Sequence, residues 1–493
     1  MKKKNAITIC LSLAGLLSGL PAHANNEFQQ WMQQQSQGIT AEKKEFQEYK
    51  DKRDKEFTSF LKAQWKSVDL VKGDVRDEKP KPDVMPVAKL EPIVKPVMEP
   101  RIKPEPIVVT VPKPVVVKAP VAVPIIVAPK GKLLTINFYG QSLRFYYDGS
   151  MRKTLSSAIN KEAVSDYWSA LSRTEYDGLL KQLKAQKESL QLTDWAYASM
   201  VNKIAVKINA SRKNESALLS WFLLAKTGFK ARVAYSKFAI YLLVPSRQEL
   251  FEVSYFTFGG KRYYAVDFDG NKKKPGQVFT YDGEYPDATK EFDMRVTSVV
   301  ASNDQSERRH LSFKFEGKQY NIEVVYDRGR VKFFRTYPQL SLGLYFSSGV
   351  YKVTATPLQK QLASHMQGMS EEQAVNFLLR FVQTSLKYET DEQQFGEENY
   401  LFPEETLFYP YSDCEDRAVL FAWLVRSLLS LDVVGIDYPG HVATAIAFNT
   451  EVAGDSVRYK GKRYVISDPT YINANSGMTM PNFKQFKPKV IAY

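Results

Sequence analysis

The fold class of this chain is decided by one stretch, Tyr411-Ser412-Asp413-Cys414-Glu415-Asp416-Arg417-Ala418. Ser412 and Glu415 have the S-x-x-E spacing of a capping box, which predicts that a helix begins here. Apolar residues then recur at helical spacing through Leu429, so one face of this helix is expected to be buried. Cys414 falls in the first turn, where unpaired backbone N–H groups and the positive end of the helix dipole stabilise a thiolate. The stretch therefore predicts a cysteine nucleophile at a helix start, with Asp413 and Asp416 serving that start.

Two later stretches supply the partners that such a thiol needs. His441 follows a turn at Pro439-Gly440 and heads an alternating run that predicts a strand. Asp468 ends a second predicted strand, and His441 lies midway in sequence between Cys414 and Asp468. A histidine can take the thiol proton, and a carboxylate on the far ring nitrogen fixes the tautomer of the histidine. We therefore predict a Cys414–His441–Asp468 catalytic triad.

The segments D-C-E-D-x-A-x-L, G-H-V-A and D-P-T together resemble the transglutaminase-like superfamily, over roughly residues 357–493. The resemblance implies an α+β catalytic domain with a papain-like fold, and acyl transfer from an amide to the thiol with release to water or to an amine. It implies a protein or peptide substrate, with peptidoglycan peptides among the candidates, and no cofactor. We expect hydrolysis rather than cross-linking, because water is far more concentrated than any amine.

The long loop before Cys414 is expected to form one wall of the cleft, since loops of this length in a compact domain are usually functional. Its acidic residues would attract a cationic substrate. The oxyanion hole is expected to combine the backbone N–H of Cys414 with a side chain of this loop, Tyr411 or, as a weaker choice, Gln394.

Three other uses of these residues stay open on sequence grounds. Cysteine, histidine and aspartate also ligate zinc, but a single cysteine lacks the paired C-x-x-C spacing of structural sites, so no metal is expected. Cys414 could instead be a small core residue. A non-catalytic binding or scaffold protein could also retain the triad as a vestige.

The start of the chain predicts export. Residues 1–24 combine three lysines, an apolar core and an Ala-His-Ala cleavage site, as a secretory signal does. No later stretch is long and apolar enough to span a membrane, and Cys10 lacks the context of a lipid-attachment site, so a soluble periplasmic or secreted protein is expected. Removing the signal and its three lysines lowers the formal net charge of +14 and leaves Cys414 as the sole cysteine. The positive charge is spread out and no nucleic-acid-binding motif is present, so nucleic acid is not an expected partner.

Composition and patterning divide the remaining chain into five parts. These are an amphipathic helical segment (25–79), a Pro-rich extended linker (80–130), a degenerate transglutaminase-like domain (131–285), a small β domain (286–350) and the catalytic domain (351–493). The helix is expected to begin near Ile39, and its aromatic stripe packs on the protein itself or contacts an envelope surface. The many prolines of the linker favour polyproline II and a passive spacer.

The degenerate domain is inferred from an internal repeat. The segments Gly260-Lys261-Arg262-Tyr263-Tyr264-Ala265-Val266-Asp267 and Gly461-Lys462-Arg463-Tyr464-Val465-Ile466-Ser467-Asp468 match at five of eight positions. The same sequence offset places Lys213 opposite Cys414 and Ile240 opposite His441, and these residues cannot perform thiolate–imidazole chemistry. We therefore predict that residues 193–282 repeat the catalytic fold without its chemistry, with the same order of strands.

Overall fold

The computed structural model describes residues 22–63, 65–74, 85–88, 130–155, 158–268, 276–296 and 306–493. The chain divides into two compact units, residues 1–63 and 64–493. Most of the expected signal segment and most of the expected linker lie outside the described residues. None of the helices in the described ranges is long and apolar enough to cross a membrane.

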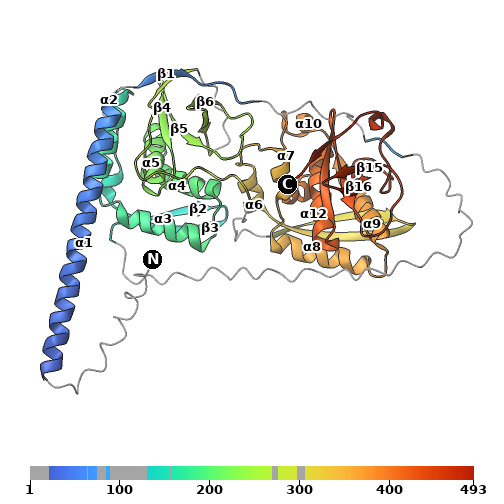
Figure 1. The fold of residues 1–493 in the computed structure, drawn as a ribbon, viewed down its shortest axis with the longest axis horizontal. Helices are drawn as coiled ribbons and strands as arrows, with labels where there is room; N and C mark the ends of the chain where they lie inside the picture. Colours follow the sequence, from blue (N-terminus) through green and yellow to red (C-terminus); the bar gives the residue numbers. More distant parts are fainter. Residues whose placement is uncertain are drawn as a thin grey trace, which may run out of the picture. The chain divides into compact units, whose positions relative to one another are not determined.

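The described part of the first unit is a single long helix, α1 (Ala22–Lys62), drawn in blue in Figure 1. The prediction of a helix here is confirmed, but the expected start near Ile39 is wrong, because the helix already includes Ala22. Two members of the aromatic stripe, Phe46 and Tyr49, are exposed.

The second unit begins with residues that the sequence assigns to the helical segment and the linker. Strand β1 (Lys66–Asp69) pairs with β8 (Gln277–Thr280) at the edge of a sheet. Residues 85–88 also pack on the folded body: the Ala88 N–H donates to the Ile472 carbonyl at 2.8 Å, the Ile472 N–H donates to the Pro86 carbonyl at 3.0 Å, and Ala88 is buried. The interpretation of residues 80–130 as a passive spacer is therefore wrong for residues 85–88.

Residues 130–296 form a first structural repeat. It opens with a hairpin of β2 (Lys132–Phe138) and β3 (Gln141–Tyr147) and a 3₁₀ turn (Gly149–Met151). Its helices are α2 (Lys161–Ser172), α3 (Asp177–Ser189), α4 (Asp194–Ile208) and α5 (Lys213–Lys226). Its further strands are β4 (Arg232–Tyr235), β5 (Ile240–Pro245), β6 (Tyr255–Phe258) and β7 (Lys261–Val266), followed by β8. The sheet has the order β1-β8-β4-β5-β7-β6.

Residues 306–493 form a second repeat. It opens with a hairpin of β9 (Ser306–Phe315) and β10 (Lys318–Asp327), followed by α6 (Arg328–Phe334), α7 (Leu342–Ser347), α8 (Lys352–His365) and α9 (Glu371–Ser385). Next come β11 (Lys387–Tyr388), α10 (Asp391–Phe395), α11 (Pro403–Phe408), β12 (Tyr411–Ser412) and α12 (Cys414–Leu429). The last elements are β13 (Asp432–Tyr438), β14 (His441–Ala447), β15 (Ser456–Tyr459), β16 (Lys462–Ser467), a 3₁₀ turn (Pro481–Phe483) and β17 (Lys489–Ile491).

The two repeats share one strand order. The second sheet runs β17-β13-β14-β16-β15, and the strands β8-β4-β5-β7-β6 of the first sheet follow the same path with antiparallel pairing throughout. The helix before each sheet begins at equivalent positions, Lys213 and Cys414, and the central strands begin at Ile240 and His441. The predicted equality of strand order is confirmed.

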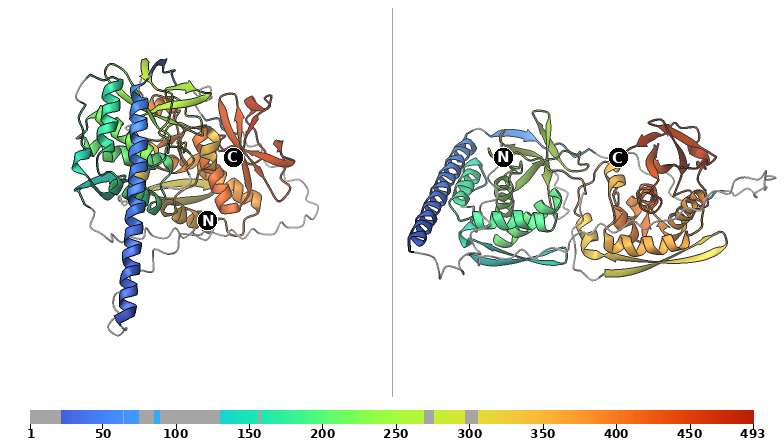
Figure 2. Two further views of the ribbon diagram at one scale, coloured as in Figure 1. Left: turned by 60° about the vertical axis from the view of Figure 1, so that its left-hand side comes forward. Right: turned by 60° about the horizontal axis from the view of Figure 1, so that its bottom comes forward.

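The repeat is larger than the sequence suggests. In the first repeat β2 packs on α4 and β3 on α3; in the second, β9 packs on α9 and β10 on α8. Figures 1 and 2 show each hairpin against the helices of its own repeat. Both hairpins turn at a pair with positive φ, Tyr139-Gly140 and Glu316-Gly317. The expected separate β domain at 286–350 is therefore wrong, because its hairpin belongs to the second repeat.

One insertion distinguishes the repeats. Residues 209–212 join α4 to α5, whereas the much longer connection 386–413 joins α9 to α12. The sequence offset between the two equivalent hairpins is consequently smaller than the offset between the equivalent helices that follow the insertion. The inserted segment carries β11, α10, α11 and β12, and it leads directly to Cys414.

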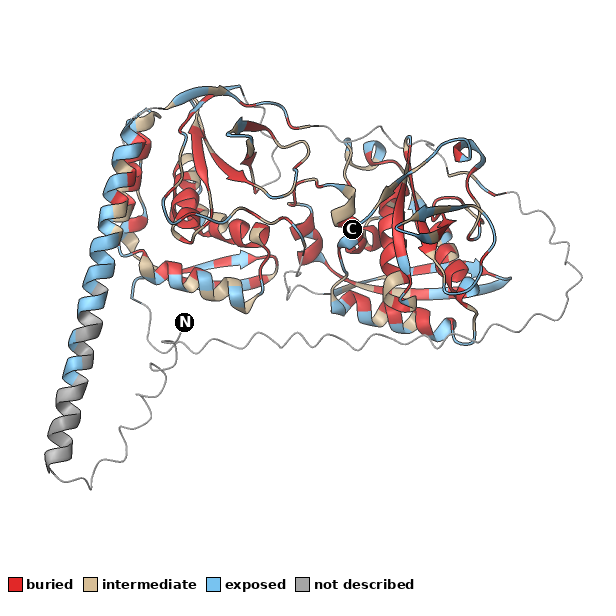
Figure 3. Cartoon of the chain, in the orientation of Figure 1, coloured by how far each residue is buried: buried red, intermediate tan, exposed pale blue. Residues whose placement is uncertain are grey.

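Helix α12 lies at the centre of the second repeat. It packs against α7, α8, α9, α11, β13 and β14, and every residue from Cys414 to Val425 is buried. Figure 3 shows it as a buried element, unlike the hairpin strands, which alternate between buried and exposed residues. The sequence predicts burial of one face only. The helix is instead enclosed all round, which places its first turn inside the protein.

Candidate active site

Helix α12 begins where the sequence predicts, but the predicted capping hydrogen bonds are not formed. The N-cap residue is Asp413, and its side chain makes no capping hydrogen bond. The Ser412 hydroxyl instead accepts a hydrogen bond from Arg417 Nε at 3.1 Å. The predicted capping box of Ser412 and Glu415 is therefore wrong. Asp413 lies at the helix start as expected, but its side chain does not cap the helix.

The thiol of Cys414 and the ring of His441 line one cavity of about 250 Å³. The polar part of its lining includes Glu398, Glu415 and Asp437, and the apolar part includes Val442 and Ile491. Cys414 belongs to the first turn of α12, and His441 begins β14, the strand that packs against this helix. The packing of the helix on the sheet thus brings the two residues to one site.

The ring of His441 is fixed by a carboxylate and by an aromatic side chain. Its Nε2 lies 2.8 Å from Asp468 Oδ2. The other oxygen of Asp468 accepts hydrogen bonds from the backbone N–H groups of Thr470 and Tyr471, which hold the carboxylate in place. Phe483 stacks on the imidazole with ring centroids 4.9 Å apart. The predicted His441–Asp468 pair is therefore present, with the expected order of partners.

The second ring nitrogen, Nδ1, is buried and has no hydrogen-bond partner among the described residues. Because a buried imidazole nitrogen without a partner loses its hydration, an incoming proton or donor would be favoured at this atom. Nδ1 is therefore the ring nitrogen that is able to accept a proton in this arrangement.

The thiol itself is held by a different partner from the one predicted. Cys414 Sγ donates to Glu415 Oε2 at 2.9 Å, and within the described part of the chain no hydrogen bond joins the thiol to His441. Burial raises the pKa of the Cys414 thiol well above its usual range, and the negative charges of Glu415 and Asp413 add to this effect, although a backbone hydrogen bond from Val442 opposes it. Burial and the neighbouring carboxylates therefore disfavour the thiolate in this geometry, against the expected effect of the helix start.

The two side chains expected to complete the oxyanion hole do not line the cavity. The Tyr411 N–H donates to Gln394 Oε1 at 3.2 Å, and Gln394 Nε2 donates to the Tyr411 carbonyl at 3.4 Å. This exchange fixes α10 to the short strand β12. Gln394 therefore positions the chain that leads to Cys414, and the hypothesis of an oxyanion role for Tyr411 or Gln394 has no support in the geometry.

The inserted loop forms part of the cavity wall, since Glu398 and Tyr400 line it. A buried ion pair anchors this loop: Arg330 Nη2 lies 3.0 Å from Glu404 Oε1, and both side chains are almost fully buried. Arg309 of the hairpin also donates to the backbone carbonyls of Leu407 and Tyr409. The hairpin and α6 thus hold the loop against α12, a role that the sequence pattern does not reveal.

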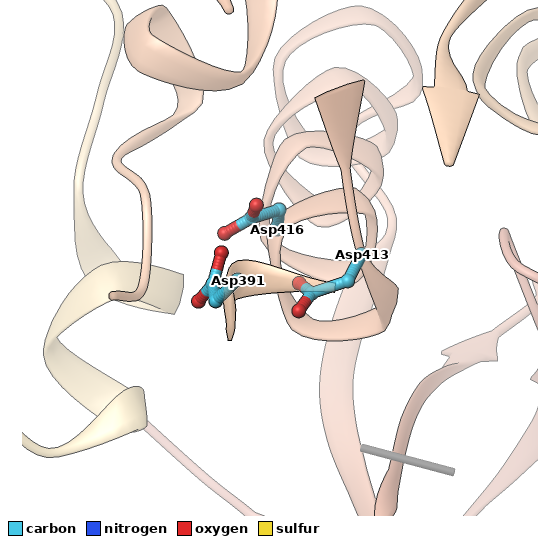
Figure 4. A group of neighbouring side chains, drawn as sticks. All are labelled: Asp391, Asp413 and Asp416. Atoms are coloured by element: carbon cyan, nitrogen blue, oxygen red, sulfur yellow. The ribbon is translucent and has the colours of Figure 1, made fainter. Parts of the chain in front are cut away.

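A cluster of carboxylates lies beside the thiol and was not expected from the sequence. Asp391, Asp413 and Asp416 each offer an oxygen within 4.8 Å of the other two, and Figure 4 shows the three side chains gathered at the start of α12. Asp391 also forms a second such group with Glu398 and Glu415. Burial raises the pKa of Asp391, Asp413 and Asp416 well above the usual range, and the mutual repulsion of the carboxylates raises it further.

These all-oxygen groups suit a hard cation such as Ca²⁺ or Mg²⁺, and they do not suit zinc. Within the described ranges, Cys414, His441 and Asp468 do not form a three-ligand group. The local signal for the cluster is the run of acids around Cys414, whereas Asp391 is distant in sequence and is brought in by the insertion.

No protein-family model, no curated protein and no solved structure matches this chain. The resemblance to transglutaminase-like enzymes thus stays a prediction from the sequence motifs.

Proposed function

We propose that this chain is a transglutaminase-like cysteine acyltransferase that acts mainly as an amidohydrolase on a protein or peptide substrate in the cell envelope. One observation carries the proposal. His441 is held by Asp468 through Nε2, keeps Nδ1 without a partner among the described residues, and lines the same cavity as the thiol of Cys414. A fixed histidine with one unused nitrogen beside a lone thiol is what a cysteine nucleophile requires.

In the proposed reaction the thiol first leaves Glu415 and turns toward His441. Nδ1 takes the thiol proton, and the sulfur attacks the carbonyl carbon of the substrate amide. The imidazolium then gives its proton to the leaving amine, and a thioester remains on Cys414. Water, deprotonated by His441, attacks the thioester, so that a carboxylic acid leaves and the thiol takes back its proton. Asp468 stabilises the imidazolium in both halves of the reaction.

The charge of the cavity supports a substrate with a cationic group near the scissile amide. Glu398, Glu415 and Asp437 all line the cavity, and among the described residues no lysine or arginine lines it. Val442 and Ile491 offer an apolar surface for an aliphatic chain. A lysine-like or diamino-acid side chain combines both properties.

A second function, that of a non-catalytic binding protein, is favoured by the hydrogen bond from the thiol to Glu415, because a protonated thiol is not nucleophilic. The degenerate first repeat shows that this chain retains the same strand order without a thiol or an imidazole at the equivalent positions. In that case the cavity would bind a cationic peptide without turning it over.

The test uses the chain from residue 25 onward with a glutamine-containing peptide and a primary-amine tracer. We expect free acid as the main product, with little tracer incorporated. Cys414→Ala should abolish the product, whereas Lys213→Ala, at the equivalent position of the first repeat, should leave it unchanged. Stoichiometric incorporation of the tracer would overturn the preference for hydrolysis. Peptide binding without product in the unmodified chain would favour the binding protein.

A further inference from the structure

The sheet of the second repeat ends in a strand whose outer edge is unpaired. β17 is the last strand in the order β15-β16-β14-β13-β17, and it pairs with β13 through residues 489–491. Within the described ranges no other strand or bridge pairs with it. Lys489 is exposed, and Val490 and Ile491 are half-buried. The backbone N–H and C=O groups on the outer side of β17 therefore form a template on which a further strand can pair.

The first repeat shows what such an edge accepts. Its strand β8 occupies the place of β17 in the strand order, and there β1 adds to the outer edge in antiparallel pairing along its whole length. Figure 1 shows β1 at this edge of the first sheet. The second sheet has no such strand among the described residues, because the nearby segment 85–88 pairs beside Ile472 instead. One position of the shared architecture is thus filled in the first repeat and open in the second.

The open edge lies beside the cavity that holds the thiol. Ile491 of β17 lines this cavity together with Asp437 and Tyr438, the last two residues of β13. A strand that pairs antiparallel with β17 runs in the same direction as β13, because β17 is itself antiparallel to β13. β13 ends at Tyr438, which is paired with His441. The C-terminal end of an added strand therefore points toward the end of the sheet that carries His441.

We propose that the substrate binds as an additional antiparallel strand on β17, in the place that β1 takes in the first repeat. The residues that precede the scissile amide form this strand, and the residues that follow it enter the cavity. Backbone hydrogen bonds supply affinity in this mode of recognition, and side chains in pockets supply selectivity. In the cavity Glu398, Glu415 and Asp437 favour a cationic side chain near the amide.

The pairing also narrows the class of substrate. Several consecutive α-linked residues in extended conformation are needed to follow the edge of a strand. The substrate is therefore an unfolded segment of a polypeptide rather than a short envelope peptide. This inference rests on the proposed acyl transfer only in calling the bound chain a substrate, since the pairing itself is measured by binding.

The test uses the Cys414→Ala chain from residue 25 onward, so that binding is measured without turnover. The probe is a capped peptide with the sequence of residues 65–72, which contains β1. Calorimetry compares this peptide with four versions, each N-methylated at one backbone amide from the position of Ser67 to that of Leu70. Successive N–H groups of a strand point to opposite sides, so two alternate methylations should each weaken binding about three- to tenfold and the other two should not. Equal losses at all four positions, or no binding of the parent peptide at millimolar concentration, would overturn the proposal.

Proline substitutions in the same Cys414→Ala chain assign the edge. One of Lys489→Pro and Val490→Pro removes an N–H from the open edge, and the other removes an N–H that faces β13 and should melt lower. The variant that keeps its melting temperature should bind the peptide at least about threefold more weakly. The matched control is β15, the other edge strand of this sheet. Whichever of Val457→Pro and Arg458→Pro keeps its melting temperature should bind the peptide normally.

Hydrogen exchange gives a second reading that needs no variant of β17. Bound peptide should slow the exchange of backbone amides within residues 488–492, and unchanged exchange there would refute the assignment to β17. The same holds for unchanged affinity in the open-edge proline variant. Either result would leave the proposed acyl transfer intact if the unmodified chain still released free acid from the glutamine-containing peptide.

Discussion

Replacing Glu415 with glutamine should make the thiol of Cys414 more reactive. In the structure the thiol donates to Glu415 Oε2 at 2.9 Å, so a thiolate at the same position would face a negative charge at this distance. Two unit charges 2.9 Å apart repel by about 6 kcal/mol at an effective dielectric constant of about 20. Even about 2 kcal/mol of this repulsion, once removed, would raise the thiolate population roughly 30-fold at neutral pH.

The gain in rate is smaller than the gain in thiolate, because a thiol of lower pKa is also a weaker nucleophile. With a Brønsted coefficient of about 0.4–0.5, the rate of alkylation should rise roughly five- to eightfold. The assay is alkylation by iodoacetamide at pH 7.5 in EDTA, followed by mass spectrometry of the chain from residue 25 onward, in which Cys414 is the only thiol. Glu372→Gln, which removes an exposed acid, is the charge-matched control. An unchanged or lower rate in Glu415→Gln would show that Glu415 does not hold the thiol in its protonated form.

Four further outcomes follow from the structure. Glu404→Ala leaves Arg330 buried without its carboxylate partner and should lower the free energy of unfolding by about 3–5 kcal/mol in urea titrations. Glu323→Ala, which breaks the ion pair of a half-buried glutamate with the exposed Arg308, should cost about 1 kcal/mol or less. Ala88→Asp should lower the melting temperature, because Ala88 is buried in the core of the second sheet; an unchanged value would show that residues 85–88 do not pack there. Burial raises the pKa of Glu405 to about 8, so the folded chain holds this proton more tightly than the unfolded chain, and between about pH 4.5 and 8 the group makes stability fall as pH rises. Glu405→Gln should flatten that pH dependence by up to about 1.4 kcal/mol per pH unit, and an unaltered slope would contradict the assignment. Phe483→Ala removes the ring that stacks on His441 and should lower kcat more than it raises KM, since it loosens the base and Phe483 itself does not line the cavity.

The sequence predicts the elements that position the site because their signals are local. The helix that starts at Cys414 has apolar residues at helical spacing, and the strands at His441 and Asp468 alternate, so the packing of a helix on a sheet brings the three residues to one region. The shared strand order could be predicted because several separate segments of the two repeats are similar in sequence and are related by the same sequence offset.

The errors arise from interactions that have no local pattern. The sequence offset between the two repeats changes at the insertion, so a comparison at a single offset misses the hairpins and divides the second repeat in two. The S-x-x-E spacing predicts a capping box. Because the whole first turn is buried, the Ser412 hydroxyl instead accepts a hydrogen bond from Arg417, and Glu415 accepts one from the Cys414 thiol. The pairing of Gln394 with Tyr411 accompanies two very short parallel strands, β11 and β12, which are too short to be recognised in a sequence.

The central claim is that Cys414 carries the acyl group of an amide substrate, with His441 as its base. The most direct measurement is the intact mass of the chain, quenched in acid during turnover of the glutamine-containing peptide. The account predicts an adduct with the mass of the acyl group on Cys414, removed by hydroxylamine, and absent in Cys414→Ala and in His441→Ala. Release of free acid at an undiminished rate by Cys414→Ala, without any adduct on the unmodified chain, would contradict it.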